Sequence, residues 1–90
     1  MFYVYIMFSE VNGDIYIGST ANVEARLARH NSGKVRSTKG NRPWRLLEIH
    51  EYDTRVGAMR MERYFKTHQQ RELIRKRYNL DLHLHHSEAW

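Results

Sequence analysis

The first twenty residues follow a pattern of apolar and polar positions that predicts a β-hairpin. Apolar and aromatic residues occupy 2–8, and a second strand is expected over 14–18, where Ile15-Tyr16-Ile17 follow a polar stretch that contains Asn12-Gly13-Asp14. Asn-Gly between two such runs is a strong hairpin signal, so we expect the two segments to pair antiparallel. This pairing would bring Tyr5 and Tyr16 close together, either as ordinary half-buried strand aromatics or as a reactive pair.

The middle of the chain predicts a helix followed by a third strand. Residues 19–22 offer several helix caps, and Val23 and Leu27 would form the apolar face of a helix over 23–30. A polar, basic loop over 34–43 then leads to a strand over 44–52. Trp44 at the start of that strand could stack on nucleic-acid bases, but we prefer a position in the core.

Two more helices are predicted before the end of the chain. The first runs over 56–68, where Ala58, Met61 and Phe65 have the spacing of a core-facing stripe. The second runs over 70–78, with Leu73 and Ile74 expected to point inward. This order of elements predicts an α+β fold, a small antiparallel sheet covered by helices. Ninety residues make one domain, which we assign to 1–80, with 81–90 as a C-terminal tail.

Composition excludes some classes of protein. The absence of cysteine excludes disulfides and thiolate metal sites. The N-terminal apolar run of about seven residues is too short to span a bilayer, and it lacks the basic leader of a secretory signal. We therefore expect a cytoplasmic protein that does not interact with membranes.

Charge points to a polyanionic partner. The formal net charge is +5, and no acidic residue interrupts the basic ones between residues 25 and 47. Such a patch attracts phosphate backbones, although a solvated basic surface that only maintains solubility is the alternative. The side chains that we expect to bind nucleic acid are Arg29, Lys34, Arg36, Lys39, Arg42 and, on a later helix, Lys66.

Two pairs of charged residues have helical i, i+4 spacing. Arg26 and His30 would share one face of the first helix, and Glu62 and Lys66 would share a face of the second. Glu62 lies beside the apolar stripe, so its carboxylate would lie at the edge of the core and could bind a cation. The alternatives are a surface cation at Arg26, a helix-capping His30 and an exposed Glu62–Lys66 ion pair.

These residues together resemble the GIY-YIG nuclease superfamily. The resemblance is carried by Tyr3-Val4-Tyr5, Tyr16-Ile17-Gly18, Arg26 and Glu62 in that order, and it runs from about Phe2 to Lys66. The segment 18–22 together with Arg26 and His30-Asn31 is similar to the small, single-domain branch related to the excision-repair endonuclease. The resemblance implies a three-stranded antiparallel sheet flanked by helices. Two positions depart from the family pattern: Tyr3 replaces the first glycine, and Ser19 stands where some repair enzymes have lysine.

The resemblance also implies metal-dependent hydrolysis of phosphodiester bonds in DNA. Glu62 would bind one Mg²⁺ or Mn²⁺, and Arg26 would contact the scissile phosphate. Tyr16 would orient or deprotonate the attacking water, and Tyr5 would support it or exchange roles with it. His30 would be an alternative base or a phosphate contact.

Substrate and partners are less constrained by the sequence. Single-stranded or structured DNA is the expected substrate, because the chain has no separate domain for gripping duplex DNA. The rival interpretations are a non-catalytic nucleic-acid-binding module and a nuclease subunit that needs a protein partner or a second copy. In the tail, His83, His85 and His86 could bind a transition metal, but we assign no functional metal there.

Overall fold

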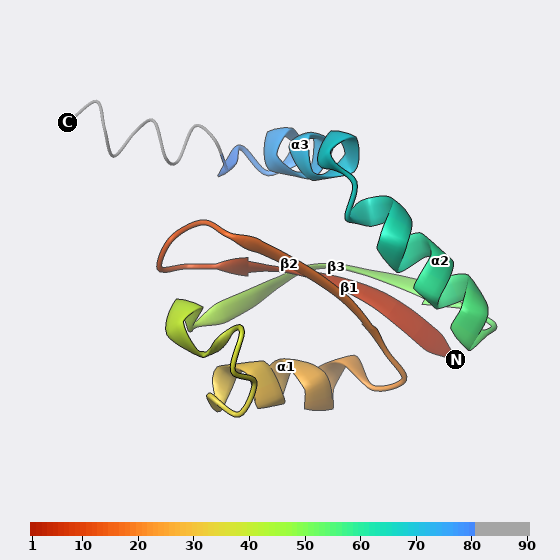
Figure 1. The fold of residues 1–90 in the computed structure, drawn as a ribbon, viewed down its shortest axis with the longest axis horizontal. Coiled ribbons are helices and arrows are strands. Elements are labelled where there is room, and N and C mark those ends of the chain that lie inside the picture. Colours follow the sequence, from red (N-terminus) through yellow and green to blue (C-terminus); the bar gives the residue numbers. More distant parts are fainter. Residues whose placement is uncertain (81–90) are drawn as a thin grey trace.

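The computed structural model describes residues 1–80, and it confirms the predicted α+β fold (Figure 1). Three antiparallel strands form one sheet in the order β2-β1-β3. Helix α1 covers one face of the sheet, and α2 and α3 cover the other. In chain order the elements are β1 (Phe2–Ser9), β2 (Ile15–Thr20), α1 (Val23–Asn31), a 3₁₀ turn η1 (Lys39–Asn41), β3 (Trp44–Tyr52), α2 (Arg55–Phe65) and α3 (His68–Arg77).

The central position of β1 explains its unbroken run of apolar residues. Val4, Ile6 and Phe8 pack in the cluster beneath α2 and α3, whereas Tyr5 and Met7 pack in the cluster beneath α1. A strand that is covered on both faces has no solvent side, so its side chains need not alternate between apolar and polar. The two clusters therefore lie on opposite faces of one strand.

The hairpin turn between β1 and β2 follows the sequence prediction. Gly13 has a φ of 80°, a conformation that glycine adopts without a steric penalty. The Asn12 side-chain oxygen accepts a hydrogen bond from the Asp14 amide at 3.0 Å, and the buried Ser9 hydroxyl oxygen accepts from the amides of Val11 and Asn12. The turn thus fixes the register that pairs Met7 with Tyr16 and Tyr5 with Gly18.

The last two helices differ in detail from the prediction. Helix α2 ends at Phe65 and α3 begins at His68, because the Thr67 hydroxyl accepts a hydrogen bond from the Gln70 amide and caps a new helix. The expectation that Leu73 points inward was wrong: it is 46% exposed, whereas Ile74 is fully buried. Successive helical residues lie about 100° apart, so only one of this pair faces the sheet.

Within residues 1–80, no helix has both the length and the apolar character needed to cross a bilayer. The predicted C-terminal tail, with its three histidines, lies outside the described residues.

Candidate active site

The two motif tyrosines lie together on the face of the sheet that α1 covers. Their ring centroids are 6.1 Å apart and the rings are stacked, as the predicted hairpin required. Tyr5 pairs across the strands with Gly18, and its ring lies directly over that glycine. A Cβ atom at Gly18 would lie only 2.5 Å from the Tyr5 hydroxyl oxygen, so the motif glycine makes room for the first tyrosine.

His30 joins α1 to the tyrosines through a buried chain of hydrogen bonds. Its Nε2 lies 3.0 Å from the Tyr5 hydroxyl oxygen, and its Nδ1 lies 2.9 Å from Thr38 Oγ1. Because the Thr38 hydroxyl donates to the Val35 carbonyl oxygen, it accepts from Nδ1–H, which leaves Nε2 to accept from Tyr5 O–H. His30 is 1% exposed, so both of its ring nitrogens are committed to the protein.

The pKa shifts of His30 and Tyr5 agree with this donor–acceptor direction of the hydrogen bonds. Burial lowers the pKa of His30, and the positive charges of Arg26 and Arg29 lower it further. Burial raises the pKa of Tyr5 far above its ordinary value, and the neighbouring Tyr16 adds to this, while Arg26 opposes it. At neutral pH the imidazole is therefore uncharged and the Tyr5 phenol keeps its proton.

Tyr16 is the more accessible of the two tyrosines. It is half-buried, with its ring edge-on to His30 at 4.8 Å and to Trp44 at 6.1 Å between ring centroids. Unlike the 1% exposed Tyr5, it lines an open pocket of about 360 Å³ at the hairpin end of β2. Packing thus fixes the ring while one side of the residue faces solvent.

Arg26 lies at the opposite end of β2, in a second pocket. This pocket has a volume of about 260 Å³, and Ser19, Thr20 and Arg55 also line it. Arg26 is close enough to Tyr5 and His30 to act on the pKa of both. A guanidinium in a recess beside a phenol is suited to bind a phosphate oxygen.

Glu62 reaches the same strand from the other face of the sheet. Side chains alternate along β2, so Tyr16 and Gly18 face α1, whereas Ser19 faces α2. The Ser19 hydroxyl donates a 2.6 Å hydrogen bond to Glu62 Oε1, and Lys66 Nζ lies 2.7 Å from Oε2. Burial opposes ionisation of Glu62, but the hydrogen bonds from Lys66 and Ser19 outweigh it, so the pKa lies below its ordinary value.

The edge strand β2 therefore connects the predicted site residues. Tyr16, with Tyr5 and His30 behind it, lies on one side of this strand, and Glu62 lies on the other, with the Arg26 pocket at its end. The predicted nucleic-acid ligands Arg29, Lys34, Arg36, Lys39, Arg42 and Lys66 are all exposed. Trp44 is 5% exposed and donates from its indole to the Thr38 carbonyl oxygen, so it belongs to the core, as preferred.

Three residues of the site were missed by the sequence reasoning. Ser19 was noted as a possible helix cap and as a departure from the family pattern, yet its hydroxyl bonds Glu62. Thr38, in the loop after α1, completes the hydrogen-bond chain through His30, and a single threonine in a loop forms no sequence pattern that marks such a role. Asn31 was noted within the motif without a role, and its amide bonds both the N–H and the C=O of Trp44, at 2.7 and 3.0 Å.

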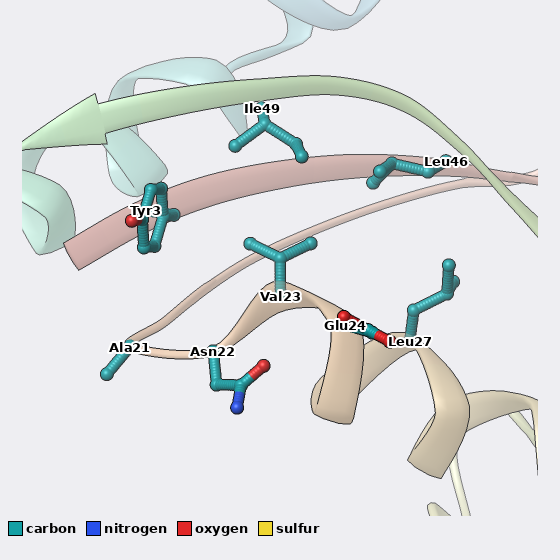
Figure 2. A pocket seen from close by; sticks show the side chains of 8 residues that line it. All are labelled: Tyr3, Ala21, Asn22, Val23, Glu24, Leu27, Leu46 and Ile49. Carbon is teal, nitrogen blue, oxygen red and sulfur yellow. The ribbon is translucent and has the colours of Figure 1, made fainter. Parts of the chain in front are cut away.

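An apolar hollow lies beside the site rather than in it. Figure 2 shows Tyr3, Leu46 and Ile49 from the sheet facing Val23 and Leu27 of α1, around a space of about 450 Å³. Tyr3, which replaces the motif glycine, is thus a wall of this hollow.

Comparison with known proteins is consistent with this geometry. The GIY-YIG catalytic domain family matches residues 1–79. A UPF0213 protein of Staphylococcus haemolyticus is 39% identical over 74 residues, which cover 81% of this chain and 89% of that protein. The structure-specific endonuclease subunit slx1 of Xenopus laevis is 37% identical over 67 residues, 66% of this chain but only 24% of the frog protein.

A solved structure has the same fold. The solution structure of a UPF0213 protein from Bacillus halodurans is 33% identical, with a TM-score of 0.50 and 82% of each chain covered. The motif tyrosines, Gly18, Arg26 and Glu62 thus stand in a fold shared with these relatives. The chain belongs to the GIY-YIG catalytic domain family.

Proposed function

We propose that this protein is a metal-dependent endonuclease that hydrolyses phosphodiester bonds in DNA, with single-stranded or structured DNA as its substrate. The observation that carries the proposal is the grouping of Tyr16, Arg26 and Glu62 around the edge strand β2, in a chain whose predicted nucleic-acid ligands are exposed. The family match and the endonuclease named among the relatives support the same chemistry.

Glu62 fits a hard divalent cation such as Mg²⁺ or Mn²⁺. Its pKa lies below the ordinary value, so the carboxylate is ionised at neutral pH, and lone pairs remain on both oxygens beside the bonds from Ser19 and Lys66. Residues 1–80 contain no cluster of three potential metal-ligating side chains. Magnesium tolerates a single protein carboxylate, because water and phosphate oxygens complete its coordination. When bound, the cation supplies Lewis-acid stabilisation of charge on the phosphoryl oxygens.

The chain's own side chains supply the remaining chemistry. Arg26 binds the scissile phosphate and stabilises the negative charge that grows in the transition state. Tyr16 orients the attacking water and, as the phenolate, would accept its proton, because it is the more accessible of the two tyrosines and its ring stacks on Tyr5, which Arg26 is close enough to influence. Tyr5 and His30 act as positioning residues: their buried hydrogen bond fixes the ring against which Tyr16 stacks.

Two substitutions test the proposed site. Glu62→Gln and Arg26→Ala should each lower cleavage of labelled DNA in Mg²⁺ or Mn²⁺ by about 100-fold or more. The exposed residues Glu51 and Arg63 provide matched controls, and Glu51→Gln and Arg63→Ala should cleave like the unaltered protein. An EDTA arm measures cleavage without divalent cations. Cleavage by either site variant at the rate of its control would exclude the proposed site.

A partner-dependent nuclease subunit is the second candidate function. It is favoured by one relative, the structure-specific endonuclease subunit slx1 of Xenopus laevis. In that case the isolated chain would bind DNA but cleave it slowly, and a partner would restore the rate. The third interpretation, a non-catalytic binding module, requires DNA binding without metal-dependent cleavage at stoichiometric protein.

A further inference from the structure

A pocket of about 360 Å³ at the hairpin end of β2 carries two arginines to which the mechanism gives no role. Helix α3 contributes Arg71 and Arg75, and the opposite wall is formed by Tyr16 together with Asn41 and Asp14. The two arginines are four residues apart, so they lie on one face of α3. Figure 1 shows α3 on the α2 side of the sheet, toward the β1–β2 turn.

Both guanidinium groups are held in place by the backbone. Arg71 donates from Nη1 to the Ile15 carbonyl oxygen at 3.3 Å and from Nε to the Lys66 carbonyl oxygen at 3.2 Å. Arg75 donates from Nη1 to the Gly13 carbonyl oxygen at 3.2 Å. An arginine has five N–H donors, so these bonds leave three on Arg71 and four on Arg75.

The positive charge of this pair is not neutralised within residues 1–80. No carboxylate lies within ion-pair distance of Arg71 or Arg75 in this part of the chain. Asp14 lines the same pocket, but its carboxylate accepts a hydrogen bond from the Asn41 amide instead. Covering the start of β2 and the turn before it requires only one donor from each arginine, so the unused donors and the charge need another explanation.

Helix α3 is anchored firmly enough to position these groups. Its fully buried Ile74 packs in the apolar cluster between the sheet and helices α2 and α3. Just beyond the end of the helix, Tyr78 donates from its hydroxyl to Glu48 on β3 at 2.7 Å, and Arg77 also bonds that carboxylate. The guanidinium groups of Arg71 and Arg75 therefore have a fixed place relative to Tyr16.

We propose that Arg71 and Arg75 form a second phosphate-binding site, which binds a phosphate a few nucleotides along the strand from the scissile one. This inference rests on the proposed function. Tyr16 is shared by both sites, so the strand would run along β2 from the Arg26 pocket, past Tyr16, to the arginines of α3. The six residues of β2 span about 20 Å, room for several phosphates. Fixed, multi-donor guanidinium groups suit a phosphate better than a diffuse basic surface does.

Binding measured in EDTA tests this site separately from catalysis. The double variant Arg71→Gln/Arg75→Gln is compared with the unaltered protein by fluorescence anisotropy of a labelled single-stranded oligonucleotide at several salt concentrations. Affinity should fall about tenfold, and the slope of log K against log salt should become shallower by roughly 0.7 per lost phosphate contact. Arg60→Gln/Arg63→Gln on α2 removes the same charge from exposed positions and should change the slope much less.

A charge-retaining variant distinguishes phosphate binding from a structural role. Arg71→Lys/Arg75→Lys should recover most of the salt slope, even if thermal unfolding shows that the lost backbone bonds weaken the fold. If the Arg71→Gln/Arg75→Gln variant does not fold, Arg75→Gln alone, which removes one hydrogen bond, is measured in the same anisotropy assay. A glutamine variant with the affinity and slope of the α2 control would overturn the second site. Normal cleavage in Mg²⁺ would in that case leave the proposed nuclease function standing.

Discussion

Replacing Gly18 with alanine tests how tightly the two tyrosine motifs are coupled. The added Cβ would lie 2.5 Å from the Tyr5 hydroxyl oxygen, 2.7 Å from Cζ and 3.0 Å from Cε1. Tyr5 is 1% exposed and hydrogen-bonded to His30, so its ring has no free space in which to move. Overpacking a core costs about 1–3 kcal/mol, and a broken buried hydrogen bond costs about 1 kcal/mol more.

We therefore expect Gly18→Ala to lower the free energy of unfolding by about 2–4 kcal/mol, measured by urea denaturation. In a domain of this size the melting temperature should fall by more than about 8 °C. The double-mutant cycle with Tyr5→Leu provides the control, because leucine lacks the three atoms that meet the new Cβ. In that background Gly18→Ala should be nearly neutral. A cost below about 0.5 kcal/mol in the unaltered protein would refute the close approach.

Three further predictions concern the residues around the tyrosines. Asn31→Ala removes both hydrogen bonds to the Trp44 backbone and should lower the free energy of unfolding, measured in urea, by about 1–3 kcal/mol. Ser32→Ala, at an exposed position, should change it by less than about 0.5 kcal/mol. Thr38→Val leaves the buried His30 N–H without an acceptor and should cost a similar 1–3 kcal/mol or so; an unchanged midpoint would contradict the hydrogen-bond chain. Because the folded pKa of His30 lies below its unfolded value of about 6.5, the unfolded state binds more protons. The stability that depends on neutral His30 is thus complete above pH 6.5 or so and is lost as the pH falls, and His30→Gln should flatten the pH dependence of the melting temperature.

The Ser19–Glu62 hydrogen bond gives a structural meaning to one departure from the family pattern. A lysine side chain at that position would bring a charge to Glu62, whereas serine brings a short neutral donor at 2.6 Å. In this chain the cation beside Glu62 is Lys66, the residue that follows the last residue of α2. Ionisation of Glu62 is therefore favoured from the end of its own helix and from β2 together.

Local rules in the sequence were enough to predict the hairpin and the start of the first helix. Asn12-Gly13 specifies the turn, and Asn22, one of the predicted caps in 19–22, accepts a hydrogen bond from the backbone amide of Ala25. The boundary between α2 and α3 was predicted two to three residues too late, because Thr67 caps a new helix and no apolar periodicity marks that choice. The exposed Leu73 was missed for a related reason: its neighbour Ile74 has equal apolar character.

The sequence by itself determined which residue types could form a phosphodiester-cleaving site and that a hairpin carries the two tyrosines. The resemblance to the GIY-YIG superfamily, carried by the order of the tyrosines, Gly18, Arg26 and Glu62, implied their roles. Only the tertiary structure decided which faces they share. Glu62 meets Ser19 across 43 residues of sequence, and Tyr5 meets His30 across 25, because the sheet order puts β2 at an edge between α1 and α2. Periodicity along a chain assigns each side chain to a face of its own element, but the packing of the elements decides which faces meet.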